Sequence, residues 1–491
     1  MKQASVKSNF VMNAILAAAG FLFPLITFPY VSRVLLPVGT GKVALATSVI
    51  TYFTMFAQLG IPTYGIRACA RVRDDREKLS QTVHELLGIS LAMAVISYGL
   101  LFAALLVIPK LAKERLLYII MSVSLLLNAA GMEWLYKGLE QYRYITVRSI
   151  AFKLAALAAV FLLIHEEKDY ILYGGISIFA ASASNILNLV HARKYIDLHR
   201  PRDCDWRQHL KPVLIFFAMA CAATIYTNLD TLMLGFMTGD ADVGYYNAAV
   251  KIKGVLVSVV TALGAVLLPR ASWYIEQGKK EAFHRMTQKA IRFVLLCAAG
   301  VSLYFILFAE EGILLLSGDA YMESILPMRI IMPTVLFIGL TNILGIQILV
   351  PLGKEKIVLR SEIAGAVVDL ILNAVLIPQF RAAGAAAGTL AAEAVVLGVQ
   401  YYALREETGE LFRKYPWGKL ASGLLLAAAG SVWTKALGLR SLWSLMISAV
   451  CFFGIYGGFM LWRKDEILTE TLERVRQRLE GHRERDYNNR R

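Results

Sequence analysis

The sequence predicts an all-α integral membrane protein of about 14 transmembrane helices, built as two pseudo-symmetric six-helix lobes followed by a C-terminal helix pair. Of its 491 residues, 57% are hydrophobic and only 18% are charged. The mean hydropathy of +0.56 is far above that of a soluble globular chain. Apolar runs long enough to cross the ~30 Å hydrocarbon layer recur along the whole chain.

Fourteen apolar runs bounded by charged or turn residues qualify as membrane-spanning helices. The first seven are predicted at 9–32, 43–61, 82–108, 116–136, 150–164, 169–190 and 212–236. The second seven are predicted at 244–269, 293–309, 325–351, 357–377, 383–403, 420–436 and 442–462. The first run continues to Val31, which is too long for the apolar part of a signal peptide, so it is interpreted as a span.

Basic residues alternate between the two sides of this arrangement. With the N-terminus in the cytoplasm, the inner segments hold 38 of the 51 lysines and arginines and the outer connections hold 9. The positive-inside rule therefore predicts a multi-pass membrane protein with both termini cytoplasmic. This asymmetry explains most of the formal charge of +15, so we expect no nucleic-acid partner.

The inner connection 191–211 separates six spans from the next six. The predicted domains are an N-terminal lobe at 1–200, a C-terminal lobe at 201–405, a helix pair at 406–462 and a basic cytoplasmic tail at 463–491. A shift of 203 residues superposes Gly41 on Gly244 and Arg67 on Arg270. Six spans per half make the repeats parallel in topology, with a substrate site expected between them.

Nothing in the sequence favours an enzyme. The longest outer connection, about 310–324, could not form a catalytic domain, and the chain has no GxxxxGK[ST], GxSxG or HExxH motif. The five cysteines show neither a disulfide framework nor metal-ligand spacing. We therefore predict a transporter with no catalytic residue, no cofactor and no metal.

Ionisable residues inside the spans are costly in lipid and mark cavities or pathways. Lys251 and Lys253 lie deep in one span, and Asp230 lies at a similar depth in the span before it. Asn228 and Asn247 belong to polar stripes on the same two spans. The lysines could neutralise Asp230, or one of them could meet an anionic substrate; the sequence leaves both interpretations open.

Several further cations lie nearer the span ends. Lys153 and Arg329 are placed to extend toward the membrane surface, whereas Arg67, Arg148 and Arg270 could line an inner vestibule that attracts pyrophosphate. The complete predicted substrate site is cation-lined and consists of Arg33, Arg67, Arg148, Lys153, Asn228, Asp230, Asn247, Lys251, Lys253, Arg270 and Arg329. Asp369 and Glu393 lie at comparable depth on the two spans around Pro378, where they could couple transport to H⁺ or Na⁺ or serve in packing.

Short motifs in a fixed order resemble the polysaccharide-unit flippases of the multidrug/oligosaccharidyl-lipid/polysaccharide exporter superfamily. These motifs are the segments 29–35, 59–67 with Arg73-Asp74-Asp75, Glu133-Trp134 with Gly138, Glu140 and Arg148, 228–230, 243–249, 347–356, and Ile377-Pro378 running into 384–386 and Glu393. The chain departs from the family pattern at Leu36, Val38 and Thr40 in the first outer turn, and at Asp369, where Asn is usual.

The resemblance implies a V-shaped cavity between the lobes that opens alternately to each side. It also implies a substrate of undecaprenyl-pyrophosphate-linked oligosaccharide, moved from the inner to the outer leaflet of the bacterial cell membrane for capsule, teichoic-type or O-antigen assembly. Glycosyltransferases and a polysaccharide polymerase are the candidate partners. A multidrug exporter of the same superfamily is one alternative, for which a net acidic lining is expected. A membrane-embedded glycan polymerase or ligase is the other, and it would form a covalent product.

The split of basic residues generates a test of topology. We expect cysteines introduced at Asp240 and Gly318 to react with an impermeant thiol reagent in intact cells, and cysteines at Asp203 and Glu480 to react only after permeabilisation. Labelling is compared with that of the unsubstituted protein. The reverse pattern would refute the predicted orientation.

Overall fold

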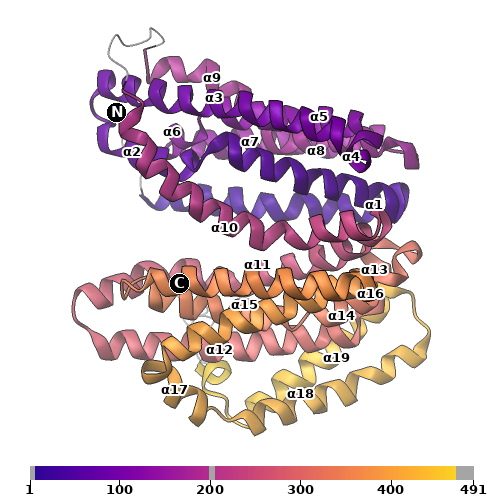
Figure 1. The fold of residues 1–491 in the computed structure, drawn as a ribbon. Coiled ribbons are helices and arrows are strands. Elements are labelled where there is room, and N and C mark those ends of the chain that lie inside the picture. The colour runs from indigo at the N-terminus through magenta and orange to yellow at the C-terminus, as the bar shows by residue number, and fades with distance from the viewer. Residues whose placement is uncertain (1–5, 198–204, 471–491) are drawn as a thin grey trace, which may run out of the picture. The chain divides into compact units, whose positions relative to one another are not determined.

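The computed structural model describes residues 6–197 and 205–470 (Figure 1). This part of the chain forms helices and contains no β-strand, which confirms the all-α fold class. Eleven of its helices are long and apolar enough to cross a membrane, or twelve if the pair Asp319–Ile331 and Thr334–Leu349, bent by 44°, is one span. The predicted tail lies largely outside the described residues.

Two of the long helices are interrupted where the sequence predicts outer turns. Helix α1 (Val6–Gln58) breaks at Leu36, with φ 55° and ψ 177°, and α16 (Glu355–Ala403) breaks at Arg381, with φ 49° and ψ −128°. Leu36 precedes Pro37, whose ring disfavours helical backbone in the residue before it. Each helix contains two of the predicted spans, so the number of spans depends on counting these breaks as turns, and the total of fourteen stays a prediction.

Three other predicted spans are single apolar runs in the sequence but broken helices in the structure. The run 116–136 divides into α5 (Arg115–Ala130) and α6 (Glu133–Gly138), because Met132 adopts a left-handed backbone with φ 45°. The run 169–190 divides into α8 (Tyr170–Ser182) and α9 (Ile186–His191) around a 3₁₀ turn. The run 325–351 ends in a π-helical segment, Asn342–Leu349.

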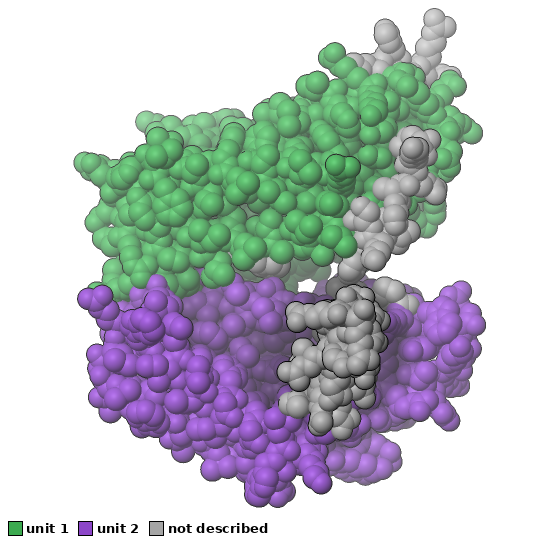
Figure 2. Space-filling model, turned by 180° about the vertical axis from the view of Figure 1, so that it is seen from behind, with its two compact units in different colours: residues 1–248, 316–321, 369–385 green, residues 249–315, 322–368, 386–491 purple. Residues whose placement is uncertain are grey.

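The described residues form two compact units (Figure 2). Unit 1 comprises residues 1–248, 316–321 and 369–385. Its remaining helices are α2 (Ile61–Val72), α3 (Arg76–Val107), α4 (Pro109–Lys113), α7 (Tyr142–Leu163), α10 (Arg207–Met237) and the start of α11 (Asp240–Glu276). Helix α1 packs against α3, α5, α7 and α10, so the first two predicted spans form the centre of this unit.

Unit 2 comprises residues 249–315, 322–368 and 386–491. It holds the rest of α11 with α12 (Lys280–Leu307), most of α13 (Ala309–Ser317), α14 (Ile325–Ile331), α15 (Thr334–Thr341), α17 (Arg405–Lys414), α18 (Trp417–Val432) and α19 (Ser441–Trp462). Helix α12 packs against α14, α15, α18 and α19, and α18 pairs with α19. The predicted domain boundaries at residues 200 and 405 separate consecutive sets of spans, whereas each compact unit combines segments that are distant in sequence. These boundaries stay a prediction.

Two of the short sequence motifs meet on the side of unit 1 that is predicted to be cytoplasmic. Arg73 forms an ion pair with Glu140, with 3.0 Å between Nη1 and Oε1. Asp75 caps α3, because its carboxylate accepts the backbone N–H groups of Glu77 and Lys78, each at 3.1 Å. These bonds, chiefly the one from Lys78, hold the pKa of the Asp75 carboxyl below its usual value.

Two glycines allow α1 and α11 to cross in backbone contact within unit 1. A Cβ atom on Gly41 would lie 1.7 Å from the carbonyl oxygen of Asp240, and one on Gly244 would lie 2.1 Å from that of Pro37. These are the two glycines that the 203-residue shift superposes, so the predicted repeat pairs positions that touch each other. Only a residue without a side chain fits at either position.

This contact predicts a strong effect of a single methyl group. Gly41→Ala should lower the free energy of unfolding by about 1–3 kcal/mol or more, because the backbone of α11 must move away. The midpoint of thermal unfolding and the amount of protein in the membrane measure it. Gly99→Ala is the matched control, since a Cβ atom there meets nothing within 4 Å. Equal stability of the two variants would show that the crossing is not tight.

Candidate functional site

A buried carboxylate joins three distant segments of unit 1. Asp230, on α10, is only 6% exposed. Its Oδ2 accepts a hydrogen bond from the hydroxyl of Tyr246 at 2.5 Å, and its Oδ1 accepts one from Nδ2 of Asn373 at 2.6 Å. A carboxylate inside a membrane protein needs such donors, because an unsatisfied one costs several kcal/mol. Asp230 is thus a junction between α10, the start of α11 and the 369–385 segment of α16.

The polar stripe predicted on α10 continues from this junction. Asn228 accepts a hydrogen bond at its Oδ1 from Ser48 of α1, at 3.2 Å. Its amide donates to the hydroxyl of Thr227 at 2.9 Å and to the carbonyl of Thr224 at 3.2 Å. The asparagine is half-buried. Much of the stripe is therefore satisfied within the unit, and Asn228 links it to α1.

The two predicted coupling acids belong to different units. Asp369 is 2% exposed in unit 1, and Glu393 is 6% exposed in unit 2. Asn373 lies four residues after Asp369 on α16, so both side chains share one helix face. Within residues 6–197 and 205–470, the Oδ1 of the buried Asn373 has no hydrogen-bond partner. Asp369, Asn373 and Asp230 therefore bring oxygen atoms of the type that hard cations bind to one region of unit 1.

The deep lysines lie on the part of α11 that belongs to unit 2. Lys251 and Lys253 are half-buried there, and Asn247, also half-buried, lies on the part of the same helix that belongs to unit 1. The neutralisation hypothesis expects Asp230 to need a lysine. In the structure, Asp230 already has a tyrosine and an asparagine donor from its own unit, so it does not depend on a lysine alone.

Arg148 is largely committed to the protein. It is 5% exposed and donates to the carbonyl of Ser184 at 2.8 Å, to Oδ1 of Asn185 at 3.1 Å and to Oε2 of Glu133 at 3.2 Å. Tyr144 also stacks beside its guanidinium group. A cation with these partners is better suited to holding α7 in place than to lining an open vestibule.

The remaining predicted cations differ in exposure. Arg67 in unit 1 and Arg270 and Arg329 in unit 2 are exposed, and Lys153 is half-buried on α7. Arg33 is exposed, and its guanidinium donates to the carbonyls of Pro29 and Leu316. The hypothesis of an inner arginine vestibule therefore depends chiefly on Arg67 and Arg270.

Tyr246 and Asn373, which bond the buried Asp230, are uncharged, so a search for charged residues alone does not find them. Tyr246 stands in the 243–249 motif next to Asn247, and Asn373 lies one helical turn after Asp369. The i+4 spacing from Asp369 is the signal that could have found Asn373. No group of three or more histidine, cysteine, aspartate or glutamate side chains in the described part of the chain could hold a metal ion.

Comparison with known families now identifies the chain. The profile described as "Polysaccharide biosynthesis protein" matches residues 6–275, more than half of the sequence. The chain belongs to this family. A second profile, described as "MatE", matches residues 215–375. The family expected from the short motifs is thereby confirmed, as a polysaccharide flippase type of the exporter superfamily.

Two named relatives align with most of this chain. It is 24% identical over 408 residues to the "Putative O-antigen transporter" of Escherichia coli K12, an alignment that covers 82% of this chain and 97% of that protein. It is 26% identical to the protein of the same name from Shigella dysenteriae, over 80% of this chain and 98% of the relative.

Solved structures show the same fold. A structure of the lipid II flippase MurJ in an inward closed conformation aligns with 92% of this chain and all of that one, at a TM-score of 0.71 and 14% identity. An inward-facing multidrug transporter of the MATE family aligns with 83% of this chain and 99% of its own, at a TM-score of 0.62 and 14% identity. The chain is a multi-pass membrane protein with the fold of these transporters.

Proposed function

We propose that this protein is a flippase for undecaprenyl-pyrophosphate-linked oligosaccharide. It moves the lipid from the inner to the outer leaflet of the bacterial cytoplasmic membrane by alternating access, for export of a cell-surface polysaccharide such as an O-antigen or capsule. The observation that carries the proposal is the match to the polysaccharide biosynthesis family, together with relatives named as O-antigen transporters that are covered almost completely.

The charge inside the membrane supports an anionic substrate. Three of the four basic residues placed inside the predicted spans, Lys153, Lys251 and Lys253, are half-buried. Such cations suit a pyrophosphate headgroup, whereas a site for cationic drugs is expected to carry an acidic lining. Exposed Arg67 and Arg270 can supply planar guanidinium donors for the same group at the cytoplasmic face.

Reconstitution in vesicles tests this function directly. The purified protein should move a fluorescent undecaprenyl-pyrophosphate oligosaccharide from one leaflet to the other, measured by its accessibility to an added quencher, while the compound stays chemically intact. A covalently lengthened or transferred glycan would support the polymerase or ligase alternative. Movement of a cationic dye without movement of the glycolipid would support the multidrug exporter.

The deep lysines give a sharper prediction within this function. At least one of Lys251 and Lys253 meets the pyrophosphate, so its replacement by Ala should abolish glycan export at nearly normal membrane abundance. Arg should rescue export in part, because charge is kept but the compact ammonium geometry is lost. Lys356→Ala, at an exposed inner lysine, is the control.

The alternative role of the lysines predicts a different pattern. If a lysine only neutralises Asp230, its loss leaves a buried acid and lowers membrane abundance. The paired change with Asp230→Asn would then recover both abundance and export. Export restored by such pairs at both lysines would rule out direct contact with the substrate.

Ion coupling is the second proposal, and it concerns Asp369 and Glu393. We infer that at least one of these acids binds H⁺ or Na⁺ during transport, which the buried oxygen atoms near Asp369 support. Asp369→Asn, which restores the usual family residue, should change the pH or Na⁺ dependence of leaflet movement in vesicles. An unchanged dependence in both Asp369→Asn and Glu393→Gln would assign the two residues to packing.

A further inference from the structure

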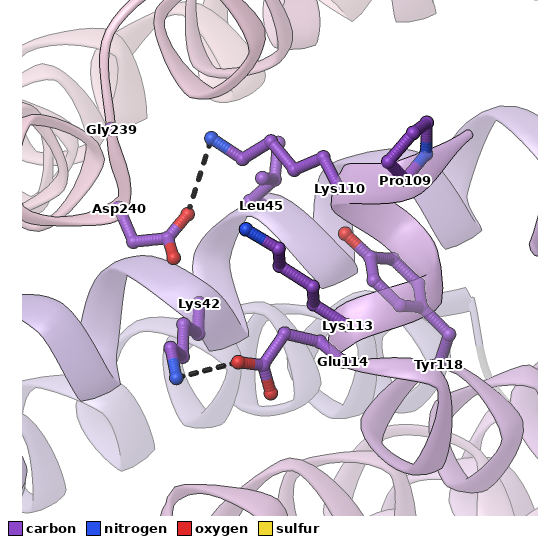
Figure 3. Close-up of a pocket in the computed structure, with 9 residues that line it drawn as sticks. All are labelled: Lys42, Leu45, Pro109, Lys110, Lys113, Glu114, Tyr118, Gly239 and Asp240. Atoms are coloured by element: carbon purple, nitrogen blue, oxygen red, sulfur yellow. Dashed lines mark ion pairs between the residues drawn. The ribbon is translucent and has the colours of Figure 1, made fainter.

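A basic cavity of about 310 Å³ lies in unit 1, apart from the buried Asp230 cluster (Figure 3). Its walls come from α1 just after the Leu36 break, from α4 with the start of α5, and from the turn between α10 and α11. All three are connections predicted to face the outside. The residues that define its chemistry are Lys42, Lys110, Lys113, Glu114, Tyr118 and Asp240.

Two of the three lysines are paired with the two carboxylates. Lys42 lies 2.6 Å from Glu114, measured from Nζ to Oε1, and Lys110 lies 3.4 Å from Asp240, measured from Nζ to Oδ1. The other carboxylate oxygen of Glu114 accepts a hydrogen bond from the Tyr170 hydroxyl at 2.7 Å. Lys110 also donates to the carbonyl of Gly235. These bonds connect the walls of the cavity and engage both of its carboxylates.

Two donors remain available in the cavity. Lys113 is exposed and has no carboxylate partner in the part of the chain that the structure describes. Tyr118 is 2% exposed, and its hydroxyl lines the cavity with no hydrogen-bond partner among residues 6–197 and 205–470. Figure 3 shows this hydroxyl pointing toward the Lys110 and Lys113 side chains. The hydroxyl opens into the cavity, where it can donate a hydrogen bond to a bound anion.

The surroundings of the cavity indicate lipid rather than water. Leu106 and Val107, at the end of α3, are 86% and 77% exposed, and Leu116 of α5 is 55% exposed. Apolar side chains with this exposure at the end of a predicted span are suited to contact with acyl chains. The cavity therefore lies beside lipid and at the end of the spans, which is the depth at which lipid phosphates are found.

We propose that this cavity binds the phosphate group of a lipid in the outer leaflet. Three lysines against two carboxylates leave a net positive charge for the anion, and Lys113 and Tyr118 supply donors from two sides. Tetrahedral phosphate can accept bonds from both at once, and lysine is a common phosphate ligand. The source can be a bilayer phospholipid or a phosphorylated lipid carrier. The proposal does not depend on which glycan is transported.

Binding of defined probes to the full-length protein in detergent tests the site. The probe is dihexanoyl phosphatidic acid, compared with dihexanoyl phosphatidylcholine, short-chain isoprenyl phosphate and inorganic phosphate, with affinity measured by native mass spectrometry. Lys113→Gln and Tyr118→Phe should each weaken binding of the phosphatidic acid by about tenfold, as loss of one charge-assisted hydrogen bond predicts. Lys113→Arg should retain most of the affinity, because it keeps the charge.

A matched control variant and the comparison between probes decide whether the proposal holds. Lys168→Gln removes an exposed lysine from another outer connection of unit 1 and should change affinity less than twofold. Equal weakening by Lys168→Gln, or no weakening by either cavity variant, would overturn the proposal. Inorganic phosphate bound as tightly as the lipid would show a site for free anions and would overturn the lipid assignment. Preference for isoprenyl phosphate over phosphatidic acid would support the proposal and name the carrier as source.

Discussion

Where α1 resumes after its break at Leu36, its backbone touches the start of α11, and both local sites of unit 1 depend on that contact. The crossing at Gly41 and Gly244 leaves no room for a side chain. It places Asp240 opposite the lysines of the basic cavity. Two residues beyond Gly244, Tyr246 reaches Asp230. One backbone approach therefore fixes the basic cavity and the buried carboxylate at the same time.

The buried acid shows how lipid as a solvent constrains the chain. Asp230 is only 6% exposed, so most of the donors to its carboxylate must come from the protein. The two that do so, Tyr246 and Asn373, are 16 and 143 residues away in sequence. A single carboxylate thus ties the 369–385 segment to the N-terminal unit, and its hydrogen bonds are strong because they form in an apolar surrounding.

Hydropathy was sufficient for the fold class, since spanning length and the exclusion of charge are properties of local sequence. The breaks at Leu36 and Arg381 were also predictable, because Pro37 and Pro378 mark them. The breaks at Met132 and within 183–185 were not, since they interrupt apolar runs that contain no proline. Tyr246 and Tyr118 were missed because tyrosine is counted among the hydrophobic residues. The polar role of each depends on which atoms lie opposite its hydroxyl.

Comparison of the cations explains why charge alone cannot locate a binding site. Arg148 was a reasonable candidate from its motif, yet three protein acceptors and a tyrosine ring use most of its guanidinium group. Lys42 and Lys110 are paired in the same way, and they shape a cavity more than they offer free charge to it. A transported or reversibly bound anion must gain contacts that the protein does not already make for itself. Lys113, which forms no ion pair within the described part of the chain, meets this condition, and so do the exposed arginines at positions 67 and 270.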